Sequence, residues 1–218
     1  MSVRVAVVDY GAGNLRSVVR ALEHAGAEAC VTANPHDLED SHAVVMPGVA
    51  AAADTMRGLS ERGLIEPILR GIRDGKPFLG LCMGLQALLT YSEEGGHQDC
   101  LNVIPGAVHK LPPGLKVPQM GWNQVTYRID HPLLDGIPDG SYFYFVHSFY
   151  AEPEQPHVVV ATTEYGIRFP SILARGNVFA TQFHPEKSGA RGLRLYENFV
   201  HLANGRPDPR DPRSWPPC

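Results

Sequence analysis

Short apolar runs alternate with amphipathic segments through the first half of this 218-residue chain. Residues 3–8, 43–46 and 78–81 are apolar runs of strand length, and each is followed by residues that favour turns. Residues 15–22 and 64–72 repeat apolar side chains at helical spacing. This alternation predicts an α/β fold in three layers, with a mostly parallel central sheet covered by helices on both faces.

After about residue 98, the pattern changes to short strand-like runs separated by glycine and proline. We interpret these runs as antiparallel strands added to the same core: residues 101–104, 117–127, 141–152, 158–163, 171–174 and 178–183. A last helix is expected over residues 189–203. Residues 1–203 are therefore predicted to form one domain, and residues 204–218, rich in Pro, Arg and Asp, a flexible tail.

Composition excludes several functional classes. The chain is 44% apolar and 19% charged, which is typical of a globular protein, and its net charge of −4 gives no support to binding of nucleic acid or acidic membranes. We expect no signal peptide, because Asp9 interrupts the first apolar run, and no membrane span, because no apolar run is long enough. Its four cysteines are scattered and form no Cys-x-x-Cys pair. We expect a cytoplasmic protein without a metal ion or cofactor.

The segment Gly80-Leu-Cys-Met-Gly-Leu-Gln86 lies where a predicted strand turns into a helix. A nucleophile at such a turn projects from the carboxyl end of the sheet, and a helix N-terminus stabilises the thiolate. Most cysteines are simply buried in cores. The two glycines leave room for a tight turn and favour the interpretation of Cys82 as a nucleophile.

The segment Thr181-Gln-Phe-His-Pro-Glu186 ends another predicted strand. His184 and Glu186 are two residues apart, so in extended backbone their side chains leave the same face. Glu186 can then hold one ring nitrogen of His184 while the other faces Cys82, as in a nucleophile–base–carboxylate triad. Alone, this pair would be interpreted as a solvated surface pair.

A third element, Met46-Pro-Gly-Val49, ends the predicted strand 43–46. Neighbouring strand ends in a parallel sheet can place the backbone N–H groups of Val49 and Met83 together as an oxyanion hole. The alternative is an ordinary Pro-Gly turn.

Together these elements resemble the triad-type glutamine amidotransferases. Five segments occur in the order seen in one of their families, the glutaminase subunit of imidazole glycerol phosphate synthase: Asp9-Tyr-Gly-Ala-Gly-Asn14, Pro47-Gly-Val49, Gln119-Met-Gly-Trp-Asn123, Phe145-Val-His-Ser148 and Gln182-Phe-His-Pro-Glu-Lys-Ser188. The resemblance covers about residues 3–203.

The resemblance implies hydrolysis of L-glutamine to glutamate and ammonia through a thioester on Cys82. The ammonia would pass to a (β/α)8-barrel cyclase subunit, in a heterodimer, to make imidazole glycerol phosphate and aminoimidazole carboxamide ribotide for histidine biosynthesis. The glutamine site would comprise Gln86, Glu94, His147, Ser148 and Phe149. The cyclase would face Asn14, Gln119, Met120, Gly121, Trp122, Asn123 and Lys187. From sequence alone, core packing of Trp122 is as good an interpretation as an interface anchor.

Two residues depart from the family pattern. Ala50 replaces the usual second glycine of Pro-Gly-Val-Gly, which would cost about 1 kcal/mol or more if the position needs positive φ. Phe149 replaces a frequent tyrosine. Three other functions remain open: a stand-alone cysteine hydrolase of the γ-glutamyl hydrolase type, a non-catalytic scaffold, and the glutaminase of vitamin B6 synthesis. A dinucleotide-binding loop at Gly11-x-Gly13 is disfavoured because Arg16 stands where the third glycine would be.

Overall fold

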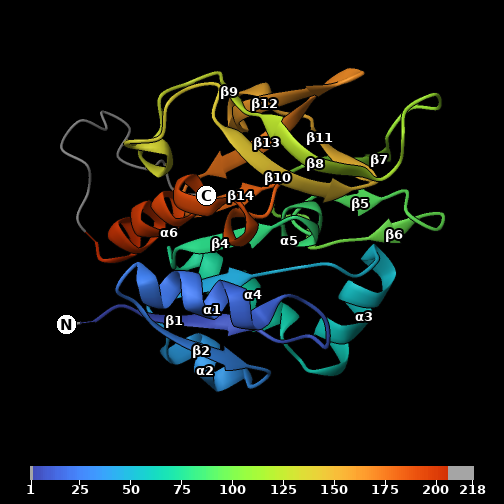
Figure 1. Cartoon of the computed structure of the whole chain (residues 1–218). Coiled ribbons are helices and arrows are strands. Elements are labelled where there is room, and N and C mark those ends of the chain that lie inside the picture. Colours follow the sequence, from blue (N-terminus) through green and yellow to red (C-terminus); the bar gives the residue numbers. More distant parts are fainter. Residues whose placement is uncertain (1, 206–218) are drawn as a thin grey trace.

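The computed structural model describes residues 2–205, so residues 206–218 of the predicted tail lie outside the described residues. An eight-stranded sheet forms the centre of the molecule (Figure 1). Its strands, in spatial order, are β2 (Glu28–Thr32), β1 (Arg4–Val8), β3 (Ala43–Met46), β4 (Phe78–Leu81), β14 (Val178–Thr181), β13 (Ile167–Arg175), β12 (Val159–Tyr165) and β9 (Thr126–Tyr127). Pairing is parallel from β2 to β14 and antiparallel from there to β9.

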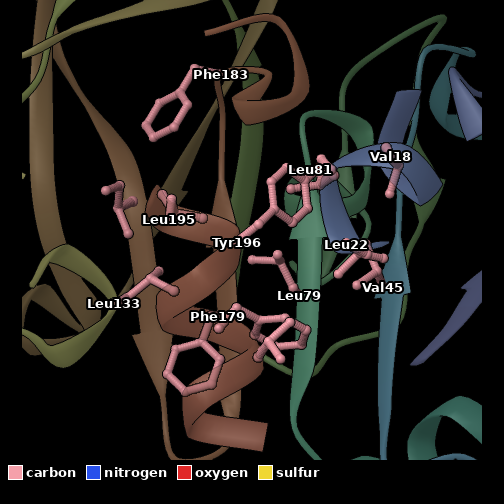
Figure 2. Packing of buried hydrophobic residues seen from close by; sticks show 14 of the residues in the cluster. Val18, Leu22, Val45, Leu79, Leu81, Leu133, Phe179, Phe183, Leu195 and Tyr196 are labelled. Carbon is pink, nitrogen blue, oxygen red and sulfur yellow. The ribbon is translucent and has the colours of Figure 1, made fainter. Parts of the chain in front are cut away.

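Helices cover both faces of this sheet because its central strands carry apolar side chains on both sides. On β1, Val5 and Val7 join the core under α1 (Leu15–His24) and α6 (Gly189–Ala203). Figure 2 shows Leu22 of α1 and Tyr196 of α6 in the same core. Ala6 and Val8 join the opposite core, under α2 (Pro35–Asp40), α3 (Ala52–Glu61) and α4 (Ile65–Arg73). The predicted three-layer α/β fold with added antiparallel strands is confirmed.

Two smaller sheets accompany the central one. One has the order β11 (Phe149–Pro153), β7 (Gly106–Lys110), β5 (Tyr91–Ser92) and β6 (Gln98–Asp99). The other pairs β8 (Gln119–Gln124) with β10 (Tyr142–His147) in antiparallel register, so that Trp122 lies opposite Tyr144. Short 3-10 helices are η1 (Pro132–Leu134), η2 (Pro156–Val158) and η3 (Pro185–Lys187).

The predicted strand at residues 101–104 is wrong. Asn102 has a φ of 51°, which breaks an extended run, and the N–H groups of residues 100–104 bond back to carbonyls of residues 87–90. The apolar side chains Leu101 and Ile104 are buried there, in the segment that closes α5 (Met83–Gln86). Its apolar composition therefore reflects packing against this short helix rather than strand pairing.

Candidate active site

The candidate site lies where three neighbouring parallel strands end. Strands β3, β4 and β14 are adjacent in the sheet, and they are followed by Val49, Cys82 and His184, respectively. Parallel strands end at one edge of a sheet, where α/β folds bind ligands. The fold thus brings together three segments that are far apart in the sequence.

Cys82 occupies a strained turn between β4 and α5. Its φ is 53°, and Asn102 is the one other non-glycine residue with positive φ in the described part of the chain. Two glycines make the turn possible. A Cβ at Gly84 would lie 2.0 Å from the Met46 carbonyl oxygen, and one at Gly80 would lie 2.5 Å from the Gly84 carbonyl oxygen. Strain of this kind holds a side chain at the top of the sheet, where Cys82 is 7% exposed.

His184 and Glu186 form a buried pair beside this turn. Nδ1 of His184 lies 2.9 Å from Oε1 of Glu186, and the two side chains are 2% and 1% exposed. His184 has extended backbone and Glu186 lies in η3, so both side chains reach the same side. The contact was expected, but the extended backbone on which that expectation rested is present at His184 and not at Glu186.

The pKa of His184 is set by opposing effects. Burial lowers it, but interactions with Cys82 and Glu186 outweigh burial and raise the pKa to about 10. Nε2 of His184 is buried and has no hydrogen-bond partner at normal hydrogen-bonding distance and angle among the described residues. This nitrogen is therefore available to interact with Cys82. Cys82, His184 and Glu186 are thus in the order that a triad requires.

A cavity of about 390 Å³ opens above Cys82 and His184. All five residues expected at the glutamine site line it, together with candidate oxyanion donors and Lys187. The lining comprises Val49, Ala50, Ala51, Cys82, Met83, Gln86, Glu94, Pro118, Val146, His147, Ser148, Phe149, His184 and Lys187.

Within the cavity, Gln86 and Glu94 are held in place from the protein side. The Gln86 amide nitrogen donates to the Phe149 carbonyl oxygen at 2.8 Å, while its amide oxygen has no protein partner in the described chain. One carboxylate oxygen of Glu94 accepts from the Ala52 N–H at 2.8 Å, at the start of α3. Both side chains therefore present acceptor oxygens in fixed positions.

The two candidate oxyanion donors lie on adjoining segments. Val49 is 56% exposed, and Met83 is the first residue of α5, where a helix leaves its N–H without an intrahelical partner. A Cβ at Gly48 would lie 2.4 Å from the Met83 Cβ, so the segments can touch only because Gly48 lacks a side chain. Among the described residues, Ala50 does not have a positive φ, so the backbone strain of about 1 kcal/mol considered for it does not arise.

An apolar surface beside the cavity is formed by Met120, Trp122, Tyr142 and Tyr144, on the outer face of β8 and β10. Trp122 is 55% exposed, so its interpretation as a core residue is wrong. Its ring meets Tyr144 edge-on at 6.2 Å, and the Lys187 ammonium lies 5.8 Å from the Tyr144 ring centroid.

The other residues expected at a partner interface differ in placement. Gln119 is 2% exposed and turned inward, because alternate residues of β8 point to opposite faces. Asn123 is half-buried and donates to the Glu164 carbonyl oxygen. Gly121 lies between the exposed residues, and Asn14 precedes α1, which packs against η3.

Sequence reasoning did not single out Gln182 or Tyr10 as site residues. Gln182 is fully buried, and its amide nitrogen lies 3.7 Å from Cys82 Sγ. Tyr10 is buried under Gly48, where burial raises the pKa of its hydroxyl to about 12. Both residues belong to segments that carry the family resemblance, Gln182 next to Phe183 and Tyr10 next to Gly11. That position in the sequence was the one available sign that they could belong to the site.

Within residues 2–205, no group of three or more His, Cys, Asp or Glu side chains is arranged to hold a metal ion. No helix in the same range is long and apolar enough to cross a membrane.

Residues 6–203 match the family model of glutamine amidotransferase class-I. The chain is 49% identical over 201 residues to imidazole glycerol phosphate synthase subunit HisH of Dehalococcoides mccartyi, covering 92% of this chain and 98% of that protein. It is 51% identical over 198 residues to the same subunit of Methanothermobacter thermautotrophicus, covering 91% and 98%.

Among solved structures, PurLQS from Thermotoga maritima matches with a TM-score of 0.74 at 20% identity, covering 93% of this chain and 99% of that chain. At this identity the likeness shows the fold alone. The sequence matches go further: the chain belongs to the class-I glutamine amidotransferases and, within them, to the family of imidazole glycerol phosphate synthase HisH subunits.

Proposed function

We propose that this chain, as the HisH-type glutaminase subunit in histidine biosynthesis, hydrolyses glutamine through a Cys82–His184–Glu186 triad. The observation that carries the proposal is the placement of His184 between the other two residues. Its Nδ1 contacts Glu186, and its Nε2 is left for Cys82. The domain responsible is residues 1–203, acting in the cytoplasm.

In the first half of the reaction, Cys82 Sγ attacks the carbonyl carbon of the glutamine side-chain amide. His184 takes the thiol proton and delivers it to the departing nitrogen, which leaves as ammonia. A raised His184 pKa suits the second task, because the imidazolium holds the proton until the leaving group takes it. Glu186 orients the ring and stabilises its positive charge.

In the second half, His184 accepts a proton from water as the water attacks the thioester, and glutamate leaves with Cys82 regenerated. Both tetrahedral intermediates carry a negative oxygen. The backbone N–H groups of Val49 and Met83 are the proposed donors to it, and each such donor is worth about 100–1000-fold in rate.

The free amide oxygen of Gln86 and the carboxylate of Glu94 suit an ammonium group, since both accept hydrogen bonds. Ser148, His147 and Phe149 complete the proposed glutamine site from β10 and β11. This donor and acceptor pattern supports a free amino acid as substrate.

The proposed acceptor of the ammonia is a cyclase subunit of (β/α)8-barrel fold, which makes imidazole glycerol phosphate and aminoimidazole carboxamide ribotide. The apolar surface of Met120, Trp122, Tyr142 and Tyr144 is the proposed docking face, with Lys187 beside Tyr144. Asn14, at the start of the helix that contacts η3, is proposed to face the same partner. Exposed aromatic side chains are typical anchors of protein interfaces. A stand-alone hydrolase of the γ-glutamyl type has no use for such a surface beside its pocket.

The test is glutamine hydrolysis by the full chain, alone and with the cyclase subunit plus its nucleotide ligand. Strong stimulation in the complex is expected; equal activity in both conditions would favour the stand-alone hydrolase. Cys82→Ala should abolish ammonia release while the variant still binds the cyclase. Retained hydrolysis by that variant would overturn the triad.

A further inference from the structure

A continuous hydrogen-bonded chain of buried amides runs beneath the cavity to the sulfur of Cys82. The Gln86 amide nitrogen contacts two acceptors, the Phe149 carbonyl oxygen at 2.8 Å and Gln182 Oε1 at 3.1 Å. Gln182 Nε2 in turn lies 3.7 Å from Cys82 Sγ. Gln182 does not line the cavity, so it reaches the nucleophile from behind.

The direction of each hydrogen bond in this chain follows from its anchor. A backbone carbonyl oxygen can only accept, so Gln86 must turn its NH₂ group towards Phe149. That same NH₂ group then donates to Gln182, which must present its oxygen to Gln86. Gln182 is left with its NH₂ group facing the sulfur.

We propose that Gln182 is a further functional residue of the glutaminase site, which donates a hydrogen bond to Cys82 Sγ and stabilises the thiolate. The proposal rests on the role of Cys82 as nucleophile. A thiolate accepts a hydrogen bond more strongly than a thiol does, so a fixed donor favours the charged form. Gln182 is 0% exposed and Gln86 is 4% exposed, so water does not compete for the donor.

The titratable groups around Cys82 act in addition to this neutral donor. His184, which follows β14, interacts with the Cys82 side chain, and Tyr10 interacts with it electrostatically. Glu94, His147 and Lys187 line the same cavity. Since Gln182 has no titration of its own, its contribution should shift the pH profile of the thiol without adding a further step.

At the end away from Cys82, the series of hydrogen bonds continues from Phe149 to β10 and β8. The Phe149 carbonyl oxygen also accepts from His147 Nδ1 at 2.8 Å, so both of its lone pairs are used. Nε2 of His147 lies 3.0 Å from the Gln119 side chain, at the start of β8. The donor to Cys82 is thus held by three elements, α5, β11 and β10, rather than by one flexible side chain.

The experiment measures the pH profile of alkylation of Cys82 by iodoacetamide in the full chain, with a Cys82→Ser sample to subtract the other thiols. Gln182→Leu removes the donor at similar volume, and Gln182→Glu keeps the shape but places an acceptor against the sulfur. We expect the midpoint of the profile to rise by about one pH unit in Gln182→Leu and further in Gln182→Glu. The kcat should fall, with KM less affected.

Ser171→Ala is the matched control. Ser171 lies on β13, and its carbonyl oxygen accepts from the Gln182 N–H. Its hydroxyl is buried and has no hydrogen-bond partner within residues 2–205. Its profile should equal that of the wild type. If Gln182→Leu fails to fold, Gln182→Glu decides the question.

An unchanged profile and kcat in the folded Gln182 variants would overturn this inference alone. Glutamine hydrolysis by Cys82→Ser at the wild-type rate would instead overturn the proposed function, and the inference with it. The two failures are therefore distinguishable in one set of samples.

Discussion

Nδ1 of His184 lies 2.9 Å from Oε1 of Glu186, with both side chains almost fully withdrawn from solvent. The pair is held by backbone that is extended at His184 and turns into η3 directly afterwards. A contact this well buried keeps the imidazole in one orientation. Removing its charge should therefore affect the chemistry more than the fold.

Glu186→Gln tests this relationship. The amide keeps the size of the side chain but loses the negative charge, so the imidazolium that forms during proton transfer is less stable. We expect kcat for glutamine hydrolysis in the cyclase complex to fall by about 100-fold or more. Steady-state kinetics checks this, and a kcat within twofold of the wild type would show that Glu186 does not serve His184.

The raised pKa of His184 also predicts a pH dependence of stability. Its pKa is about 10 in the folded protein against an ordinary value of 6.5, so the folded state binds the proton more tightly than the unfolded state. The stabilisation is fully present below about pH 6.5 and is lost as the pH rises towards about 10.

Urea unfolding at a series of pH values from 6 to 10 measures this effect. The free energy of unfolding of the wild type should decline over that range more steeply than that of His184→Gln, which cannot titrate there. Parallel curves for the two proteins would show that His184 is not protonated in the folded state at neutral pH.

The grouping of Cys82, His184 and Glu186 at one edge of the sheet could be predicted from the sequence because each residue lies within a few residues of a strand end. Cys82 follows an apolar run between two glycines, and His184 and Glu186 have the spacing that puts two side chains on one face. Because β4 and β14 are adjacent parallel strands, the residues that follow them lie close together at one edge of the sheet. Their order in the sheet is set by packing of helices on both faces.

The buried amide chain could not be predicted in the same way. Its members lie in α5, in β11 and directly after β14, and nothing in their local sequence states which amide contacts which carbonyl. The burial of Gln119 depended likewise on the register of β8 with β10, since a shift of one residue would expose it and bury Trp122. Such contacts depend on tertiary packing.

The tight turn at Cys82 predicts an intolerance of side chains at Gly84. A Cβ there would lie 2.0 Å from the Met46 carbonyl oxygen, so Gly84→Ala must push β3 and α5 apart. We expect the free energy of unfolding to fall by about 1–3 kcal/mol, measured by chemical denaturation.

Gly71→Ala is the control for this substitution. Gly71 lies inside α4, where the nearest atom to an added Cβ is the Lys76 Cδ at 3.5 Å, an ordinary contact. Alanine is the better helix former by about 1 kcal/mol, so this variant should be as stable as the wild type or more so. Equal losses in both variants would contradict the steric argument.

Trp122→Ala tests the docking face. Trp122 is 55% exposed and touches Tyr144 only at its edge, so its truncation should leave the fold intact. If it anchors the cyclase, the loss should be about 2 kcal/mol or more, which weakens the complex by about 30-fold or more. Isothermal titration of the variant into the cyclase subunit measures this. Val31→Ala is the matched control, because Val31 is 40% exposed on β2, an edge strand of the central sheet, whereas Trp122 lies in the separate sheet of β8 and β10. Val31→Ala should bind the cyclase with wild-type affinity. If Trp122→Ala also binds with wild-type affinity, the docking face lies elsewhere on the molecule.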